Sequence, residues 1–404
     1  MSIPKLEFPP FHLPAEAEAL RGEVRSFLKE TLPGIRTEDR FASWNTFSPE
    51  FSKALGKKGW IGITWPKQYG GSERSFLDRY VITEELLGNS APAGAHWVAD
   101  RQSGPLLLRF GSEEQRRAIL PRITAGECYF SIGMSEPDSG SDLASLQTRA
   151  IVDGDDYVVN GTKLWTTGAQ HASRMFCLVR TSTEGKRQEG ISFILIDMNT
   201  PGIKIEPIIS ISGDHEVNQV FLDDVRVPIA NRIGPENDGW TVAKYLLEFE
   251  RGGAAYATVL EAALNKLRAI AESEQTGGGR LIEDDAFAAK MAALEVRQMA
   301  VQATEHRIMS EIAQRGRPGP ASSMMKVLGS ENNQLISELA VEATQYYAAP
   351  YQPEARVPGN NAEPIGPAKS VPVVPKYLNF RAATIYAGSS EVQRNIMAKL
   401  VLGL

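Results

Sequence analysis

One short stretch of the chain alternates hydroxyl-bearing residues with glycines, a combination that could bind a flat polar ligand. From Ser131 it reads S-I-G-M-S-E-P-D-S-G-S-D. Glycine permits a tight backbone turn, and small side chains leave backbone N–H groups within reach of a ligand. Further along, N-G-T-K-L-W-T-T-G offers the aromatic face of Trp165 and the hydroxyl of Thr167, which share one side of an extended chain. The spacing alone leaves a second interpretation open, a Ser/Gly loop beside a core tryptophan.

Taken together, the two motifs resemble those of the acyl-CoA dehydrogenase family, flavoproteins that oxidise acyl-CoA thioesters. In that family the first motif surrounds the flavin ring and touches the thioester, while the tryptophan stacks near the flavin and the threonine bonds to it. The resemblance implies FAD as cofactor and an acyl-CoA as substrate. The flavin neighbours that it implies are Ile132, Met134, Ser135, Gly140, Ser141, Trp165 and Thr167. Ser141 would also lie near the substrate, and Ile132 departs from the pattern because relatives often carry an aromatic residue there.

The reaction of this family, α,β-desaturation, needs a carboxylate base. The base takes a weakly acidic proton next to the thioester while hydride leaves the β-carbon for the flavin, so charge developing on the carbonyl oxygen must be stabilised. Apolar surroundings raise the proton affinity of a carboxylate toward a useful range. Many members carry the base in I-Y-E-G-T near the C-terminus, but here the stretch reads I-Y-A-G-S-S-E with Ala387 at that position. An alanine cannot accept a proton.

The same C-terminal stretch keeps other roles that the resemblance implies. The backbone N–H of Ala387 would bond to the thioester oxygen, and Gly388 would allow the turn. Ser389 and Glu391 match polar positions that contact the flavin.

A second candidate for the base lies on an expected bundle helix. In a lineage that resembles isovaleryl-CoA and long-chain acyl-CoA dehydrogenases, the base immediately precedes an arginine. This chain has L-L-E-F-E-R-G-G at 246–253, in which Glu250 precedes Arg251, and Glu248 points to another side of the helix. Glu250 could instead form an ordinary salt bridge in the bundle. Because Ala387 leaves the other position without a carboxylate, we predict that Glu250 is the base and that Arg251 contributes to substrate binding.

Two motifs by which homo-oligomeric relatives hold a neighbouring subunit's cofactor are absent. In place of R-x-x-F-G, Arg280 is followed by Glu283, Asp284 and Asp285, which would repel a pyrophosphate. In place of Q-x-x-G-G-x-G, the chain reads Q-Y-Y-A-A-P-Y from Gln345, and these residues cannot mimic glycines. Some bacterial members resemble this arrangement and assemble as α2β2 from two different dehydrogenase-like chains, several acting on bulky thioesters such as steroid side chains.

The resemblance thus implies a second dehydrogenase-like subunit as partner and an electron-transfer flavoprotein as electron acceptor. Three alternatives remain open on the same fold. They are a homotetrameric dehydrogenase for branched or long acyl chains, an acyl-CoA oxidase or flavin monooxygenase, and a non-catalytic scaffold subunit.

Composition argues against several other classes of protein. A net charge of -6 with 23% charged residues predicts no nucleic-acid surface. Cys128 and Cys177 lie in apolar runs without C-x-x-C spacing, which predicts buried free thiols, and the five histidines show no metal-ligand spacing, which predicts no metal site. The N-terminus lacks an apolar signal region, and no apolar run approaches about 18 residues, so we expect no membrane insertion and a cytoplasmic protein.

The elements that must position the site fall into three blocks, in the order known from the family. We predict an α+β fold: an N-terminal all-α domain (1–125), a middle antiparallel β-barrel or sandwich domain (126–236) and a C-terminal four-helix-bundle domain (237–404). Helical spacing indicates helices at 14–32, 75–88, 95–110 and 112–124, then long ones at 239–274, 284–315 and 321–348. Short β-rich runs lie at 129–134, 157–160, 175–179, 191–196 and 217–222. Seven prolines between 350 and 375 cannot be helix interior, and two short helices follow.

Overall fold

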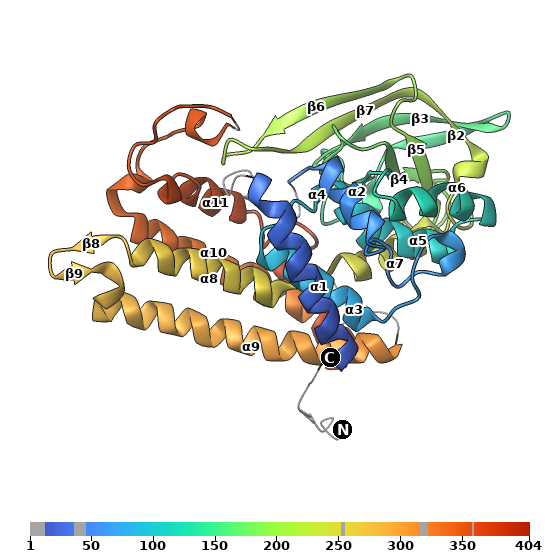
Figure 1. The fold of residues 1–404 in the computed structure, drawn as a ribbon. Coiled ribbons are helices and arrows are strands. Elements are labelled where there is room, and N and C mark those ends of the chain that lie inside the picture. Colours follow the sequence, from blue (N-terminus) through green and yellow to red (C-terminus); the bar gives the residue numbers. More distant parts are fainter. Residues whose placement is uncertain (1–12, 36–45, 252–254, 316–321, 358) are drawn as a thin grey trace.

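The computed structural model describes residues 13–35, 46–251, 255–315, 322–357 and 359–404, except for the side chains of Glu250, Arg251 and Arg315. It confirms the predicted fold class, with the helical, β and helical blocks in the predicted order. N-terminal helices come first, a curled β-sheet follows, and a layer of long helices completes the chain (Figure 1). None of the helices in the described ranges is long and apolar enough to cross a membrane.

The N-terminal block packs short helices around apolar side chains. Ser75 and Ser112 begin two of the helices with reciprocal capping boxes, to Asp78 and Gln115 respectively. A π-helical turn, Ala99–Ser103, separates the fourth helix from the fifth and packs against α7 of the C-terminal block. The helices are α1 (Ala15–Thr31), α2 (Pro49–Lys57), α3 (Phe76–Gly88), α4 (Gly94–Val98), α5 (Gly104–Phe110) and α6 (Glu113–Thr124).

The middle block is one seven-stranded sheet in the order β1-β4-β2-β3-β7-β6, with β5 paired to β4. Its strands are β1 (Phe130–Gly133), β2 (Arg149–Asp153), β3 (Asp156–Lys163), β4 (Arg174–Arg180), β5 (Ile191–Asp197), β6 (Ile203–Ile209) and β7 (His215–Pro228). Most neighbours are antiparallel, as expected, but β1 runs parallel to β4, and so does β2 at a single pair. The sheet is therefore mixed, because the chain between β1 and β4 forms the β2–β3 hairpin before it returns.

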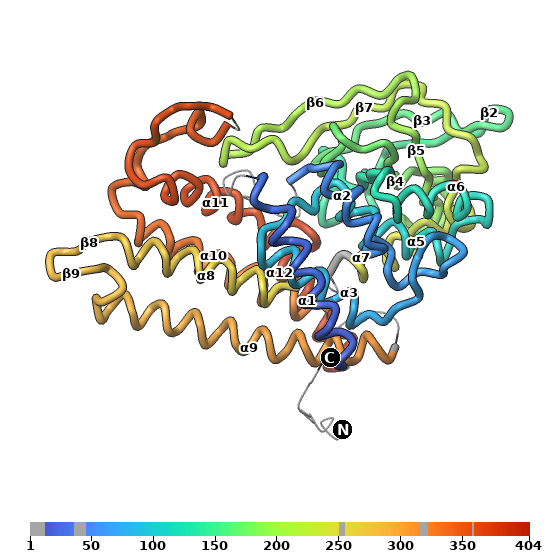
Figure 2. Tube along the Cα trace, in the orientation of Figure 1, coloured from blue at the N-terminus to red at the C-terminus, as the bar shows by residue number. Residues whose placement is uncertain are grey.

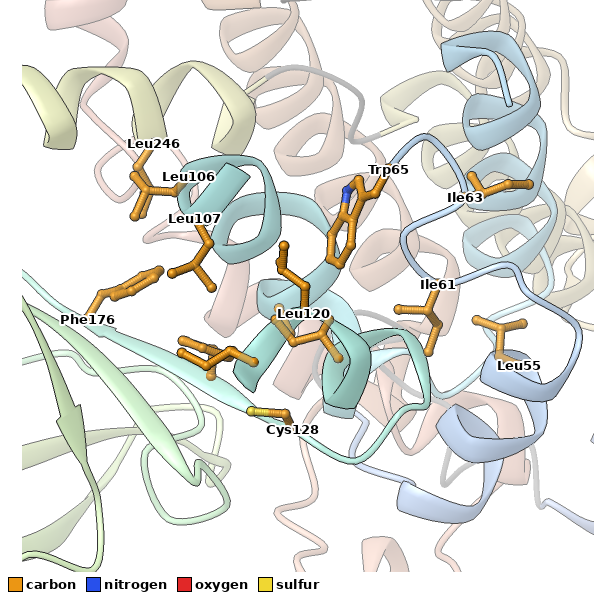
Figure 3. Packing of buried hydrophobic residues seen from close by; sticks show 14 of the residues in the cluster. Leu55, Ile61, Ile63, Trp65, Leu106, Leu107, Leu120, Cys128, Phe176 and Leu246 are labelled. Carbon is orange, nitrogen blue, oxygen red and sulfur yellow. The ribbon is translucent and has the colours of Figure 1, made fainter. Parts of the chain in front are cut away.

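Strand β4 is buried on both faces, which explains its continuous apolar sequence. Phe176 and Leu178 point to the N-terminal helices, whereas Met175 and Cys177 pack against β3 and β7 on the other side of the curl. Figure 3 shows Phe176 near Leu106 and Leu107 of α5. The sheet and the helices thus share one core, in which each fully buried apolar side chain contributes about 1.5–3 kcal/mol. Both cysteines are buried and free, as predicted.

Two strands, β2 and β6, lack the signals used for prediction. β2 buries only Ala150 among its five residues, and β6 alternates exposed or half-buried residues around Pro207. β6 lies at the end of the strand order, where a missing backbone N–H leaves no ladder bond unmade. Pairing with neighbouring strands, and not the local sequence pattern, therefore determines that both segments form strands.

The C-terminal block contains α7 (Gly239–Arg251), α8 (Tyr256–Ala271), α9 (Asp285–Arg315), α10 (Ser322–Thr344), α11 (Val373–Phe380) and α12 (Ser390–Leu400). The single helix predicted over 239–274 is wrong, because Ala255 takes a left-handed φ of 47° and α8 begins anew after it. The carboxylate of Glu305 on α9 accepts the N–H groups of Tyr256 (2.8 Å) and Ala257 (2.9 Å) and caps this new start.

The proline-rich segment after α10 packs beside the turn between β6 and β7 (Figure 2). Arg356 donates a hydrogen bond to the carbonyl of Ser212 (2.7 Å) and pairs with Asp214. Pro375 lies in the first turn of α11, where its missing N–H has no intrahelical acceptor to lose, and so it does not stand in the interior of the helix.

Candidate active site

The fold brings the two sequence motifs into direct contact. The N–H of Leu164, beside Trp165, donates a hydrogen bond to the carbonyl of Ser135 at 2.8 Å. The ammonium of Lys163 lies 2.8 Å from a carboxylate oxygen of Glu136 and also donates to the carbonyl of Met134 at 3.2 Å. The loop after β1 and the loop after β3 therefore form one unit.

Glu136 and Lys163 were not among the predicted site residues, although both stand inside the quoted motifs. The Glu136 carboxylate also accepts the backbone N–H groups of Gln147 (2.6 Å) and Thr148 (2.9 Å). Burial alone would raise the pKa of Glu136, but the Lys163 charge and these donors hold that pKa below its ordinary value. The Glu136 carboxylate is therefore ionised, and the signal that the sequence offered was a glutamate and a lysine inside the two motifs.

The Trp165 side chain is presented to solvent by a strained backbone. Its φ is 60°, and 58% of its surface is exposed. A bulky residue in this conformation costs about 1–3 kcal/mol, which tertiary contacts must offset. The backbone of Thr166 exchanges two hydrogen bonds with Asn218 on β7 (2.9 and 3.2 Å) and so supplies such contacts.

This geometry rules out one interpretation that the spacing left open and corrects one statement made from the sequence. Trp165 is not a core tryptophan, and the chain is not extended between it and half-buried Thr167. An exposed aromatic face held at positive φ instead indicates a ligand-binding surface.

The Ser/Gly loop is a tight turn with an exposed tip. Backbone atoms of Glu136 and Ser139 exchange hydrogen bonds at 2.8 and 3.1 Å, and the buried Ser139 hydroxyl donates to the carbonyl of Asp142. Gly140 and Ser141 stand exposed at the tip, whereas Ser135 is half-buried. Half-buried Ile132 and Met134 pack against the core that the sheet shares with the N-terminal helices.

The C-terminal stretch forms a second sharp turn. Ala387 and Gly388 both take left-handed φ values, 56° and 83°, and their carbonyls accept hydrogen bonds from the side-chain amide of Gln393. Ser389 then caps α12, since its hydroxyl oxygen accepts the N–H of Val392 at 3.3 Å. Glu391 is exposed in the first turn of α12, where its own backbone N–H and the Ser389 hydroxyl lower its pKa.

Glu250 and Arg251 are the last two residues of α7, and their side chains lie outside the described residues. The preceding turns of α7 bury Leu246 and Phe249. Glu248 keeps one carboxylate oxygen buried without a hydrogen-bond partner in the described part of the chain. The last described turn of α7 therefore packs apolar side chains into the core.

The positions of the two absent motifs are occupied in ways that do not suit a pyrophosphate. The guanidinium of Arg280 makes two hydrogen bonds to Glu283, at 3.0 and 2.6 Å, so a neighbouring carboxylate already neutralises it. α10 ends at Thr344 because Gln345 takes a φ of 52°, and Tyr346 is 91% exposed. These features supply neither an unpaired cation nor a glycine cradle.

The residues around the two joined loops do fit a flavin ring. The indole of Trp165 presents a flat apolar face beside the polar backbone of the Ser135 loop, and a flavin is a flat ring with a polar edge. FAD, when bound, supplies the acceptor for the hydride that leaves the acyl chain. The protein must hold the ring, bind the thioester and accept the α-proton.

Comparisons with known proteins agree with this geometry. Three family models match in succession: acyl-CoA dehydrogenase N-terminal domain (residues 14–127), middle domain (131–225) and C-terminal domain (237–402). The acyl-CoA dehydrogenases FadE26 and IpdE1 of Mycobacterium tuberculosis are each 31% identical over 96% of this chain, covering 97% and 98% of their own lengths.

Two solved complexes are also similar. The Tcur3481-Tcur3483 steroid ACAD aligns with a TM-score of 0.84 and 27% identity over 98% of this chain and 99% of the other. The ChsE4-ChsE5 complex from Mycobacterium tuberculosis aligns with a TM-score of 0.81 and 31% identity over the same shares. The chain therefore belongs to the acyl-CoA dehydrogenase family. It is an FAD-dependent acyl-CoA dehydrogenase.

Proposed function

We propose that this chain is the base-bearing subunit of a heteromeric dehydrogenase that desaturates a bulky acyl-CoA, such as a steroid side-chain thioester. The observation that carries the proposal is an asymmetry. The loops that would hold the chain's own flavin ring are joined and complete, whereas Arg280 is paired with Glu283 where homo-oligomeric relatives would reach a neighbour's pyrophosphate.

In the proposed mechanism Glu250 accepts the α-proton. Its place in α7, immediately before Arg251, matches the position of the base in the lineage that this chain resembles. The backbone N–H of Ala387 would stabilise charge on the thioester oxygen, and Ser141 and Arg251 would contact the substrate. Ile132, Met134, Ser135, Gly140, Trp165, Thr167, Ser389 and Glu391 would contact the flavin.

The proposed partner is a second dehydrogenase-like chain that supplies the missing arginine and glycines. The similar ChsE4-ChsE5 and Tcur3481-Tcur3483 structures are each named after two chains, and Tcur3481-Tcur3483 is described as a steroid ACAD. We infer an α2β2 assembly with an electron-transfer flavoprotein as acceptor.

The base assignment is tested by Glu250→Gln in the assembled enzyme. The amide keeps size but cannot accept a proton, so we expect kcat to fall by about 10²–10⁴ with flavin content unchanged. Glu248→Gln is the matched control two residues away, and its kcat should change little. Near-normal turnover of Glu250→Gln, or the large loss in Glu248→Gln instead, would show that the base is another residue.

The heteromeric assembly is tested by flavin stoichiometry. Expressed alone, this chain should be poorly soluble or largely colourless, and co-expressed with its partner it should carry two FAD per four chains. Absorbance gives the flavin-to-protein ratio, and light scattering gives the mass. A yellow homotetramer with one tightly bound FAD per subunit would refute the heteromeric proposal and leave the base assignment standing.

A further inference from the structure

The ion pair between Glu136 and Lys163 lies deep in the protein. The Lys163 side chain is 0% exposed, that of Glu136 is 6% exposed, and their charged atoms are 2.8 Å apart. A buried ion pair gains little or no stability over packed apolar side chains, since both charges must leave water. Stability alone therefore does not account for this pair, and its neighbours indicate a more specific role.

The pair connects three backbone segments around the flavin loops. Glu136 binds the N–H groups of Gln147 and Thr148 at the entry to β2. Lys163, the last residue of β3, reaches back to the carbonyl of Met134 at 3.2 Å. The positions of Ser135 on one loop and of Trp165 on the other therefore both depend on this pair.

The carbonyl that Lys163 binds belongs to the peptide group whose N–H is that of Ser135. A trans peptide directs its C=O and N–H to opposite sides, so this N–H points away from the ammonium. Within the part of the chain that the structure describes, no acceptor is recorded for the Ser135 N–H. A cation on the carbonyl polarises the amide and strengthens its N–H as a donor.

We propose that Lys163 and Glu136 are positioning residues that orient and polarise the Met134–Ser135 amide, so that the Ser135 N–H donates a strengthened hydrogen bond to the polar edge of the flavin. Glu136 fixes Lys163 in place and moderates its charge. This inference rests on the proposed placement of the flavin between the two loops. A stronger donor at the ring favours the more electron-rich reduced form, so the pair would also raise the flavin's reduction potential.

The test uses the neutral double variant Glu136→Gln/Lys163→Met in the assembled enzyme, because removing both charges together leaves no buried unpaired charge. After removal of FAD and rebinding, we expect the Kd for FAD to rise at least about tenfold, with an altered flavin absorption spectrum and a lower midpoint potential. The control Arg174→Met/Asp197→Asn removes an ion pair between β4 and β5 and should leave all three unchanged.

Wild-type FAD affinity, spectrum and potential in the folded double variant would overturn the inference alone. Failure of the wild-type assembly to bind FAD would overturn the proposed flavin site together with it. If the double variant does not fold, Glu136→Gln/Lys163→Gln decides the matter: it also leaves no buried charge but keeps a polar side chain at both positions, so the potential should again fall. An unchanged or higher potential in Glu136→Gln/Lys163→Gln would refute the polarising role.

Discussion

Glu305 allows a quantitative prediction about pH. Its side chain is buried between α3, α8 and α9, where its carboxylate accepts two backbone N–H groups of α8 and lies 3.4 Å from the hydroxyl of Tyr80. Burial raises its pKa from 4.5 to about 7, although the N–H donors partly oppose this. The titratable side chains near it include those of Glu84 on α3 and of His306, the next residue on α9.

The sign follows from the raised pKa. The folded state binds the Glu305 proton more tightly than the unfolded state, so this contribution to stability is complete below about pH 4.5 and is lost as pH rises to about 7. At about 1.4 kcal/mol per pKa unit, the loss across this window is at most about 3 kcal/mol, or about a hundredfold in an opening equilibrium.

The perturbation is Glu305→Gln, which keeps the shape of the side chain and removes its titration. The assay is amide hydrogen exchange by mass spectrometry across the first turn of α8 between pH 5 and 8, corrected for intrinsic exchange rates. As pH rises, we expect the protection of the Tyr256 and Ala257 amides against exchange to fall more in the wild type than in the variant, by up to about two powers of ten.

Glu311→Gln is the matched control on the same helix, because Glu311 makes a surface ion pair with Arg307 at 3.8 Å. Its protection curve should parallel that of the wild type. Parallel curves for wild type and Glu305→Gln would refute the raised pKa and with it the reasoning from burial.

Two further predictions concern the acyl site and the core. In the double variant Glu250→Gly/Ala387→Glu, the carboxylate placed in the C-terminal turn should recover a measurable part of the turnover, although the left-handed φ of 56° at Ala387 disfavours a larger side chain. A folded, flavin-loaded but fully inactive protein would contradict the idea that both positions face the same α-carbon of the substrate. In Gly104→Ala, the new Cβ would lie 1.9 Å from Cζ2 of buried Trp65, so the thermal midpoint should fall by an amount equivalent to about 1–3 kcal/mol. Gly22→Ala on α1, where a Cβ meets nothing within 4 Å, should not lower it, and equal midpoints for the two variants would contradict the packing.

The local sequence pattern was sufficient to predict an element or a motif wherever a residue's role depends on its neighbours in the chain. The helices α1 and α6 were predictable because apolar spacing at 3.6 residues requires one buried face, and the strands β4 and β5 because a strand buried on both sides must be apolar throughout. The serine and glycine loop and the tryptophan motif were recognisable for the same reason, since a tight turn restricts residue type locally.

Contacts between segments far apart in the sequence determined the features of the fold and of the site that the local pattern did not predict. α8 begins at Tyr256 because Glu305, far along the chain, caps its first N–H groups. Trp165 leaves the core because β7 pairs with Thr166 and holds the strained φ in place. The sequence alone determined which residues could surround a flavin; the tertiary structure alone joined them, because the Glu136–Lys163 pair forms only once the loop after β1 meets the end of β3.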